Sequence, residues 1–387
     1  MNTTAAEHTL VTSIPGSVTI LNQAFNNAGE SLFIVGGAVR DALLGVTSSD
    51  FDLATSAHPS KTIEIVEKAG FSTLTVGASF GVVIAQVSDQ PEGIEIATFR
   101  EDVGAGRRPD SVEFSNIEAD VLRRDFTVNA LFFDLNSNKI VDLVGGIDDL
   151  KNKVIRTVGN PNIRFSEDPL RKLRALRFVN RIDGCTLDER TGESLKKNPS
   201  LEGVSTERIR EELLKSIDSA VNVNRLLNML HAFDMFKEIF PGHFVQWHVN
   251  RVFDEDTKFA VIPWLLKGNA WTGGDEELHK LKFTREEITN ITFLHRLLVF
   301  QPRDIVIIKK LEERITLADE QVRLWGDLIG ATLPATIKSI QTFELTVRGE
   351  DGMKLGLIGP DLGKWILDTE VSLFIKHAQR TPQETNN

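Results

Sequence analysis

The sequence has 387 residues, 41% of them hydrophobic, and a formal net charge of −11. A chain of this length can bury a large core and form roughly two to four domains. Its negative charge argues against a protein that coats nucleic acid nonspecifically, because neutralising phosphates requires clustered Lys and Arg, but it does not exclude a localised basic surface.

Cysteine and histidine usage excludes several kinds of site. The single cysteine, Cys185, rules out a disulfide framework and a cysteine-based zinc site, and we expect it to be a small buried apolar side chain. The eight histidines show no metal-ligand spacing, and there is no Walker A loop. No apolar stretch approaches the roughly 20 residues that span a bilayer, and Met1 to Pro15 has no Lys or Arg of a signal peptide, so we expect a cytoplasmic protein.

Residues 17 to 160 alternate short helical and strand patterns, which predict a small α/β domain with a mixed sheet. The expected helices are Val18–Asn27, one that Gly36-Gly37 opens and that ends at Leu44, and Lys61–Lys68. The expected strands are Leu32–Val35, Phe51–Ala54, Thr73–Val76, Val82–Val87 and Ile94–Phe99.

From about Pro169 onward the hydrophobic periodicity is almost entirely helical, which predicts an all-helical second half. The clearest helical segments are Leu170–Phe178, Thr206–Ile217 and Val221–Phe236. Between the two halves, the paired glycines at the end of Asp142–Gly146 indicate a hinge or a tight connection. The expected fold class is therefore α+β.

Asp50 and Asp52 carry the strongest chemical signal. Residues two apart in a strand project to one face, so both carboxylates are expected beside the Gly36-Gly37 turn, whose backbone N–H groups can hold a phosphate. Carboxylates this close repel unless a cation lies between them, and Mg²⁺ commonly takes one or two carboxylates in proteins. The alternatives are a solvated surface pair and a purely structural glycine turn.

Two further segments supply candidate polar groups. Glu95 alternates with apolar neighbours in a predicted strand and is a candidate third acid near the metal, with an exposed strand carboxylate as the alternative. In the segment Arg123–Ala130 we expect Arg124 to contact a triphosphate and Asp125 to accept a hydrogen bond from a ribose hydroxyl. The alternative is a helix start that Asp125 or Thr127 caps, with Asn129 on its polar face.

The segment Glu167–Arg177 predicts a helix with acids and Pro169 in its first turn. Its polar residues recur every third position and form one stripe, made of Asp168, Arg171, Arg174 and Arg177. A capped helix with a solvated basic face is the alternative. The wider segment Lys151–Arg181 contains nine cations and two acids, a net charge of +7, so we expect the basic surface to be concentrated there.

Four motifs occur in one order: Gly36–Asp41, Asp50–Asp52, Arg123–Ala130 and Glu167–Arg171. Together they resemble the class II tRNA nucleotidyltransferase and bacterial poly(A) polymerase superfamily, which has a polymerase-β-type catalytic fold. Val204–Leu213 also resembles a motif of this superfamily, and Gly349–Gly363 resembles its C-terminal segment. The resemblance covers residues 31–217 strongly and 343–370 moderately.

The resemblance implies a catalytic head at 1–145 with a mixed sheet, a neck at 146–217 that recognises the nucleobase, a helical body at 218–300 and a tRNA-binding helical tail at 301–387. It also implies the addition of CCA to the 3′ end of tRNA from CTP and ATP, with Mg²⁺ on Asp50 and Asp52. The implied nucleotide-binding residues are Gly37, Arg40, Arg124, Asp125, Asn129, Asp168, Arg171, Arg174 and Arg177.

Several alternatives stay open. Poly(A) polymerases of this superfamily tend to carry a basic pair where this chain has Gly77–Phe80, which favours the tRNA enzyme. The loop Arg100–Gly106 is slightly shorter than in full CCA-adding enzymes, so a CC-adding enzyme is the nearest alternative, followed by an A-adding one. A protein-modifying nucleotidyltransferase would not need a basic helical half, and an inactive RNA-binding relative would have lost Asp50 or Asp52.

Overall fold

The computed structural model describes residues 2–75, 81–103, 111–240, 253–265, 275–298, 300–329 and 333–380. These residues form two compact units, Met1–Val204 and Ser205–Asn387. The first unit holds a seven-stranded sheet, and the described part of the second consists of helices and connecting segments. The α+β class with a mixed N-terminal sheet is therefore confirmed.

The sheet has the strand order β3-β4-β5-β2-β1-β8-β9. Its strands are β1 Leu32–Val35, β2 Asp52–Thr55, β3 Ser72–Leu74, β4 Val82–Val87, β5 Gln90–Thr98, β8 Leu131–Asp134 and β9 Lys139–Asp142. Strands β2 and β5 are parallel and the other neighbours are antiparallel. Strands β3 and β9 are the two edge strands, and β2 and β1 lie in the interior of the sheet. The acidic motif lies at the start of β2, and the glycine turn follows the end of β1.

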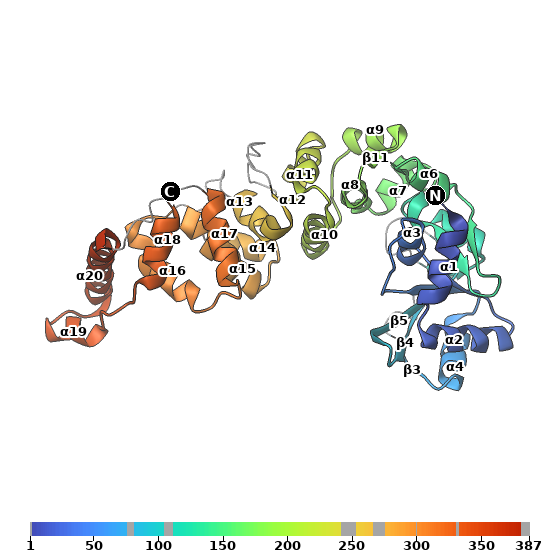
Figure 1. Cartoon of the computed structure of the whole chain (residues 1–387), viewed down its shortest axis with the longest axis horizontal. Coiled ribbons are helices and arrows are strands. Elements are labelled where there is room, and N and C mark those ends of the chain that lie inside the picture. The colour runs from blue at the N-terminus through green and yellow to red at the C-terminus, as the bar shows by residue number, and fades with distance from the viewer. Residues whose placement is uncertain are drawn as a thin grey trace. The chain divides into compact units, whose positions relative to one another are not determined.

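Helices pack on this sheet through regularly spaced apolar residues. Helix α2, Gly16–Asn27, buries Val18, Leu21 and Phe25, the three- and four-residue spacing of one helical face. It packs beside α4, Pro59–Lys68 (Figure 1). The remaining helices of this part are α1 Thr3–Ser13, α3 Gly37–Leu43 and α5 Ile117–Leu122. The predicted helices before β1, after β1 and after β2 are thus confirmed.

The rest of the first unit contains α6 Gly146–Lys151, α7 Pro161–Glu167, α8 Arg171–Arg181 and α9 Glu189–Lys197, with Cys185 fully buried. The expectation of an almost purely helical chain after Pro169 misses one short strand, β11 Thr186–Leu187, which pairs with β10 Val154–Ile155. The Asp142–Gly146 segment is a tight connection, because the Asp142 carboxylate accepts hydrogen bonds from four successive backbone N–H groups, those of residues 144–147.

Two hairpin strands extend from the sheet region, β6 Arg100–Val103 and β7 Ser111–Phe114. The expectation that Arg100–Gly106 forms a loop is therefore wrong for its first four residues, which pair with β7 as a strand. Residues 104–106 lie outside the described residues, as do Gly77–Phe80.

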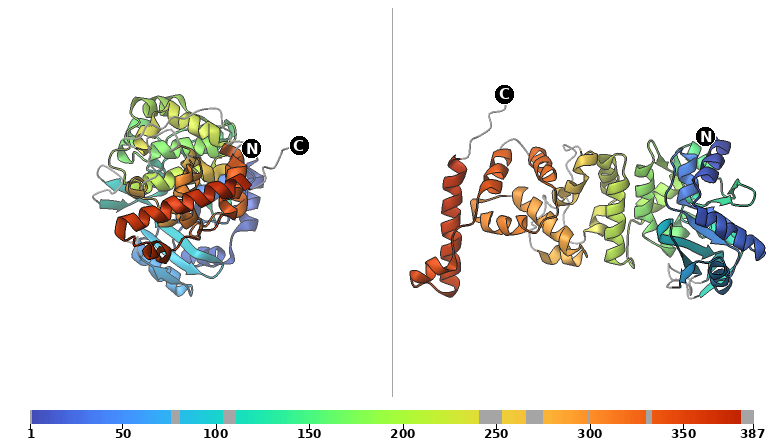
Figure 2. Two further views of the ribbon diagram at one scale, coloured as in Figure 1. Left: turned by 90° about the vertical axis from the view of Figure 1, so that its left-hand side faces the viewer. Right: turned by 60° about the horizontal axis from the view of Figure 1, so that its bottom comes forward.

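The second unit is helical over its described residues (Figures 1 and 2). Its helices are α10 Thr206–Ser219, α11 Val223–Ala232, α12 Met235–Ile239, α13 Val261–Leu265, α14 Asp275–Lys280, α15 Arg285–Leu298, α16 Ile305–Glu312, α17 Asp319–Ile329, α18 Leu333–Thr342, α19 Gly349–Lys354 and α20 Gly359–Arg380. The single helix expected over Val221–Phe236 is wrong, because Asp234 adopts a left-handed backbone conformation, φ 57°, that separates α11 from α12.

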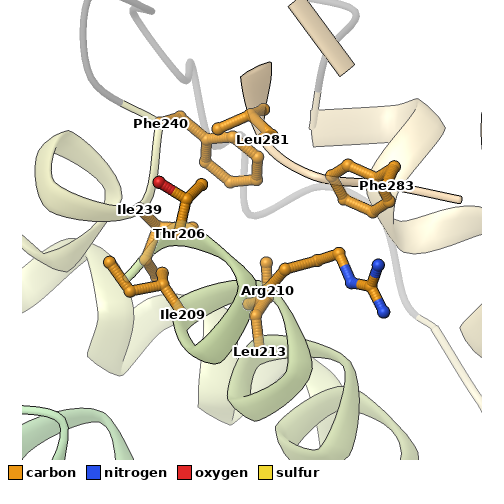
Figure 3. Close-up of a pocket in the computed structure, with 8 residues that line it drawn as sticks. All are labelled: Thr206, Ile209, Arg210, Leu213, Ile239, Phe240, Leu281 and Phe283. Atoms are coloured by element: carbon orange, nitrogen blue, oxygen red, sulfur yellow. The ribbon is translucent and has the colours of Figure 1, made fainter. Parts of the chain in front are cut away.

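Figure 3 shows a cavity of the second unit where α10 packs against Phe240 and Leu281. Its volume is about 10 Å³, which is space for one water molecule at most. It therefore cannot hold a nucleotide. Among the described residues no helix is both long and apolar enough to cross a bilayer.

Candidate active site

The acidic motif and the glycine turn meet at one end of the two central strands. Val35, the last residue of β1, pairs with Asp52, the first residue of β2. Gly36 follows with φ 68°, a backbone conformation that favours glycine, and its N–H donates to the Leu131 carbonyl. The predicted neighbourhood of the Gly-Gly turn and Asp52 is thus present in the fold.

Asp50 and Asp52 are both exposed, while Phe51 between them is buried in the core. This alternation places the two carboxylates on the same side of the chain, as the sequence predicts. The strand itself begins at Asp52, one residue later than predicted, so Asp50 lies in the preceding loop, where the Ser48 hydroxyl donates to its carbonyl.

Glu95 joins the two aspartates from the neighbouring strand. Strands β2 and β5 are parallel, with Leu53 opposite Ile96, so Glu95 lies beside Asp52. Although Asp52 remains in contact with solvent, the surrounding protein partly desolvates its carboxylate. This desolvation, together with the negative charges of Asp50 and Glu95, raises the pKa of Asp52 to about 6, although Arg124 opposes the shift. Three carboxylates thus converge with too little positive charge to balance them.

This surplus of negative charge is the feature that fits a divalent cation. Among the described residues, no group of three or more His, Cys, Asp or Glu side chains is placed so that it could hold a metal ion by itself. Two carboxylates are nevertheless the usual protein contribution to a Mg²⁺ ion that takes its other ligands from water and substrate phosphates. The residues present therefore fit an ion that binds together with a nucleotide.

Arg124 lies near this acidic group, in the segment between helix α5 and strand β8. Its guanidinium carbon lies 4.5 Å from the centre of the Phe132 ring, and Phe132 pairs with Val35 across the sheet. Two of its nitrogens donate to the Asp120 carboxylate, at 3.1 and 3.0 Å. Asp120 is 1% exposed and its other oxygen accepts from Arg123. The buried carboxylate therefore fixes both arginines of the motif.

The side chain of Asp125 is 11% exposed, and its oxygens bond to partners within the protein. One oxygen accepts from Arg174, at 2.6 Å for the shorter contact, and the other accepts from the Asn129 amide and the Phe126 N–H. Burial acts to raise the pKa of Asp125, but the charge and hydrogen bonds of Arg174 outweigh it and hold the pKa below its ordinary value. These four bonds occupy the roughly four acceptor positions of a carboxylate.

The alternative of a capped helix start at Asp125 is wrong. Helix α5 ends at Leu122, and the segment then runs through a short 3-10 turn, Thr127–Asn129, into strand β8. Phe132 and Phe133 are both fully buried because β8 is covered on both faces. The sequence shows this only as a continuous apolar run, which does not distinguish a strand from a helix.

Arg40 is 3% exposed, so it is enclosed by protein. Its guanidinium donates to Asp41, at 2.9 and 2.7 Å, and to the side-chain oxygen of Asn129, at 2.6 Å. Burial lowers the pKa of Arg40, and the neighbouring Asp41 partly offsets this. The expected direct contact of Arg40 with a nucleotide would require this arrangement to open.

The polar stripe predicted for Asp168, Arg171, Arg174 and Arg177 does not lie on one helix, because only the three arginines belong to α8. Glu167 ends α7, Asp168 lies between the helices, and α8 begins at Arg171, so the expected acids in the first turn of α8 are absent. Arg171 donates to Glu167 at 2.8 Å and to the Arg123 carbonyl at 2.9 Å. Asp168 is 9% exposed and accepts from the Leu170 N–H at 3.3 Å, and Arg177 lies 4.4 Å from the Phe178 ring.

The net charge of +7 over Lys151–Arg181 does not translate into an equally basic surface. At least five of its nine cations form ion pairs with carboxylates: Arg156, Arg164, Arg171, Arg174 and Arg181. Most of the paired acids lie outside the segment, at Asp41, Asp125, Asp149 and Asp188. A count of charges along the sequence therefore overstates the positive charge available to RNA.

Three positions that hold the site together were not singled out from the sequence: Asp41, Asp120 and Arg181. Asp120 stands three and four residues before Arg123 and Arg124, which is the spacing of ion pairs on a helix. This spacing could have predicted that Asp120 binds both arginines. No comparable local signal joins Asp41 to Arg181, because 140 residues separate them.

Comparison with known protein families agrees with this geometry. Residues 32–156 match the family described as the poly A polymerase head domain, and residues 184–246 match a probable RNA and SrmB-binding site of polymerase A. The chain is 43% identical over 197 residues to a CCA-adding enzyme of Lactobacillus helveticus, and this alignment covers 50% of the chain and 47% of the relative. The chain thus spans about half the length of such relatives.

A longer alignment joins the chain to a CCA-adding enzyme of Pediococcus pentosaceus, with 30% identity over 369 residues, 88% of the chain and 89% of the relative. Among solved structures, the CCA-adding enzyme of Bacillus stearothermophilus in complex with CTP is similar in fold, with a TM-score of 0.65, 24% identity and coverage of 96% of both chains. The Thermotoga maritima CCA-adding enzyme complexed with tRNA has a TM-score of 0.61 at 20% identity, covering 99% of this chain and 96% of that one.

Proposed function

We propose that this chain, which belongs to the family of CCA-adding enzymes, adds C, C and A in turn to the 3′ end of tRNA. It would use CTP and ATP and release pyrophosphate. The observation that carries this proposal is the convergence of Asp50, Asp52 and Glu95 beside the Gly36-Gly37 turn, with Arg124 facing them. The three acids carry more negative charge than the nearby Arg124 can neutralise, and Asp120 holds Arg124 in place. This arrangement fits a triphosphate that binds together with a metal ion better than it fits a surface with a purely structural role.

We further propose that Asp50 and Asp52 hold Mg²⁺. Bound there, the metal would lower the pKa of the attacking 3′-hydroxyl and neutralise charge on the leaving pyrophosphate. The raised pKa of Asp52, about 6, supports this assignment, because two neighbouring carboxylates would both ionise readily only with a cation present.

The triphosphate would lie against Gly37 and Arg124. Arg124 is suited to this role because Asp120 and the Phe132 ring fix its orientation before any nucleotide binds. Arg40, Asp125 and Asn129, by contrast, are enclosed and bonded to one another or to Arg174, so in this proposal they position their neighbours.

Asp168 and Arg171 would select the base. On their pairing edges, cytosine and adenine both present an amino donor followed by a ring-nitrogen acceptor, while uracil and guanine present the reverse order. A carboxylate beside a guanidinium offers an acceptor followed by a donor. Arg171 uses three of its five N–H donors within the protein, which leaves others for a base. Arg174 and Arg177 would support this pair from the next turns of α8.

The chain would then divide by role into the head at 1–145, the neck at 146–217, the body at 218–300 and the tail at 301–387, with tRNA bound by the last three. The match of residues 184–246 to an RNA-binding family segment supports this assignment. A chain with a single cysteine does not depend on disulfide bonds, which agrees with a reducing compartment. We therefore place the reaction in the cytoplasm.

The test is incubation of the purified chain with Mg²⁺, labelled CTP or ATP, and tRNA that lacks its terminal CCA. We expect extension by three nucleotides when both CTP and ATP are present. Extension that stops after two C residues would identify a CC-adding enzyme, the second candidate, which the seven-residue segment Arg100–Gly106 favours. Long A tails would identify a poly(A) polymerase. An active parent together with an inactive Asp52→Asn variant ties the activity to this site.

A further inference from the structure

Helix α8 begins and ends a closed network of polar contacts in the first unit. From Arg174 the contacts run to Asp125, then to Asn129 and Arg40, then to Asp41, and return to α8 at Arg181. Each step is a direct side-chain contact, with distances of 2.6, 3.1, 2.6, 2.7 and 2.9 Å. Arg174 and Arg181 are seven residues apart, two turns of one helix, so both project from the same face.

Phe178 lies between the two ends of this closed network. The guanidinium carbons of Arg40 and Arg174 lie 5.3 and 5.5 Å from the centre of its ring. The ring also packs edge-on against Phe126, with 5.6 Å between ring centres. Arg40 and Arg174 therefore have little freedom to rearrange, because each is held by a carboxylate or amide on one side and by the aromatic ring on the other.

The closed network connects the two parts of the site that would bind the same nucleotide, one at its base and the other at its triphosphate. Helix α8 starts at Arg171, which with Asp168 would face the base. Asp41 and Arg40 belong to α3, which begins at the Gly36-Gly37 turn beside the triphosphate. A small rotation of α8 relative to α3 would thus misplace the base-pairing groups while the phosphates stayed bound.

We propose that Arg181 is a positioning residue for nucleobase selection, a role that rests on the function proposed above. Its pair with Asp41 closes the network at the end of α8 that is farthest from the base. Arg181 stands ten residues after Arg171, roughly 15 Å along the helix axis, so it acts through the network and not by touching the base. Its side chain is 37% exposed, so its replacement leaves no large buried cavity.

The experiment compares Arg181→Gln with Arg181→Lys and with Arg156→Gln as a matched control. Arg156 belongs to the same unit, is 44% exposed and pairs with Asp149 and Asp188, but it is no part of the closed network. For each variant, kcat/KM is measured separately for CTP and for UTP on tRNA that lacks its CCA end, together with a melting curve.

For Arg181→Gln we expect the ratio of kcat/KM for CTP over UTP to fall about two- to fivefold, a size typical of losing one partly exposed ion pair. Arg181→Lys keeps the charge and should recover most of the ratio, and Arg156→Gln should leave the ratio at the parental value. A merely structural role would lower the melting temperature and slow CTP and UTP alike.

An unchanged ratio in Arg181→Gln overturns the inference, whether or not both rates fall, and so does an equal fall in Arg156→Gln. A parent protein that adds no C to the RNA contradicts the proposed function and the inference together. A parent that adds C normally, combined with a parental ratio in Arg181→Gln, contradicts the inference alone.

Discussion

Asp120 binds the guanidinium of Arg124 through two contacts, 3.1 and 3.0 Å, while its carboxylate is almost completely removed from solvent. The same carboxylate binds Arg123, whose carbonyl accepts a hydrogen bond from Arg171. One buried acid therefore orients the arginine proposed to contact the triphosphate and also supports the backbone on which the base-reading arginine rests.

Replacing Asp120 by Asn should weaken the use of every nucleotide to a similar degree. The amide loses the negative charge and leaves two partly buried guanidinium groups without a counter-ion, which costs about 3 to 5 kcal/mol when a buried pair is broken. We expect a lower melting temperature and a decrease in kcat/KM for CTP and ATP by the same factor. A variant that loses CTP use but keeps ATP use would show that Asp120 takes part in choosing the base.

Replacing Asp52 by Asn should stabilise the metal-free protein at neutral pH. The pKa of Asp52 is raised from 3.8 to about 6, so between these values the folded state binds more protons than the unfolded state, and stability falls as the pH rises. Above pH 6 the full penalty is present, and below 3.8 it vanishes. Thermal melts in EDTA should therefore show Asp52→Asn above the parent at pH 7.5 and level with it near pH 3.5.

The opposite order of melting temperatures at pH 7.5 would mean that neighbouring cations stabilise the Asp52 carboxylate in the folded protein. In either case the variant should add no nucleotide, because the substitution removes a proposed metal ligand. Near-normal incorporation by a well-folded Asp52→Asn protein would contradict the metal assignment.

Metal binding should itself depend on pH through the same carboxylate. A ligand must lose its proton to bind a cation, so the apparent affinity for Mg²⁺ should fall about tenfold per pH unit once the pH drops below 6. Titration of Mg²⁺ at pH 7.5, 6 and 5, read out by the rate of CTP incorporation on pre-formed enzyme and RNA, measures this. An affinity that stays constant from pH 7.5 to 5 would place the metal on other groups.

Asp168 and Arg124 should have separable effects on nucleotide use. Asp168→Ala removes half of the base-reading pair, so it should lose discrimination against UTP and GTP as well as rate. Two mismatched polar contacts of roughly 1 to 3 kcal/mol each correspond to about thirtyfold or more of discrimination. Arg124→Ala should lower the use of all four nucleotides alike. Firm rejection of UTP and GTP by Asp168→Ala would move base selection away from α8.

The sequence predicted the parts of this site that depend on local patterns. Asp50 and Asp52 could be placed on one side of the chain because residues two apart in a strand project to the same face. Val82–Val87 could be recognised as a strand from its own composition. The chain between Arg123 and Phe133 was harder, because two consecutive buried phenylalanines in a strand covered on both faces give no alternation.

Long-range pairing was out of reach of the sequence for a physical reason. The basic stripe of α8 has the appearance of an RNA-binding surface, yet Arg174 and Arg181 are neutralised by Asp125 and Asp41. The segment before β8 and helix α3 bring these two acids to α8 only in the folded state. Which cations remain for RNA is therefore decided by tertiary packing, and a charge count along the chain cannot give it.

The most direct test of the central claim, that this site builds CCA without a template, is competition among nucleotides. tRNA lacking its CCA end is incubated with the parent protein, Mg²⁺ and equal concentrations of CTP, ATP, UTP and GTP, and the 3′ ends of the products are sequenced. The account predicts ends that read CCA, with U and G at about 1% or less of added positions. Ends of mixed composition, long A tracts or unextended RNA would contradict it.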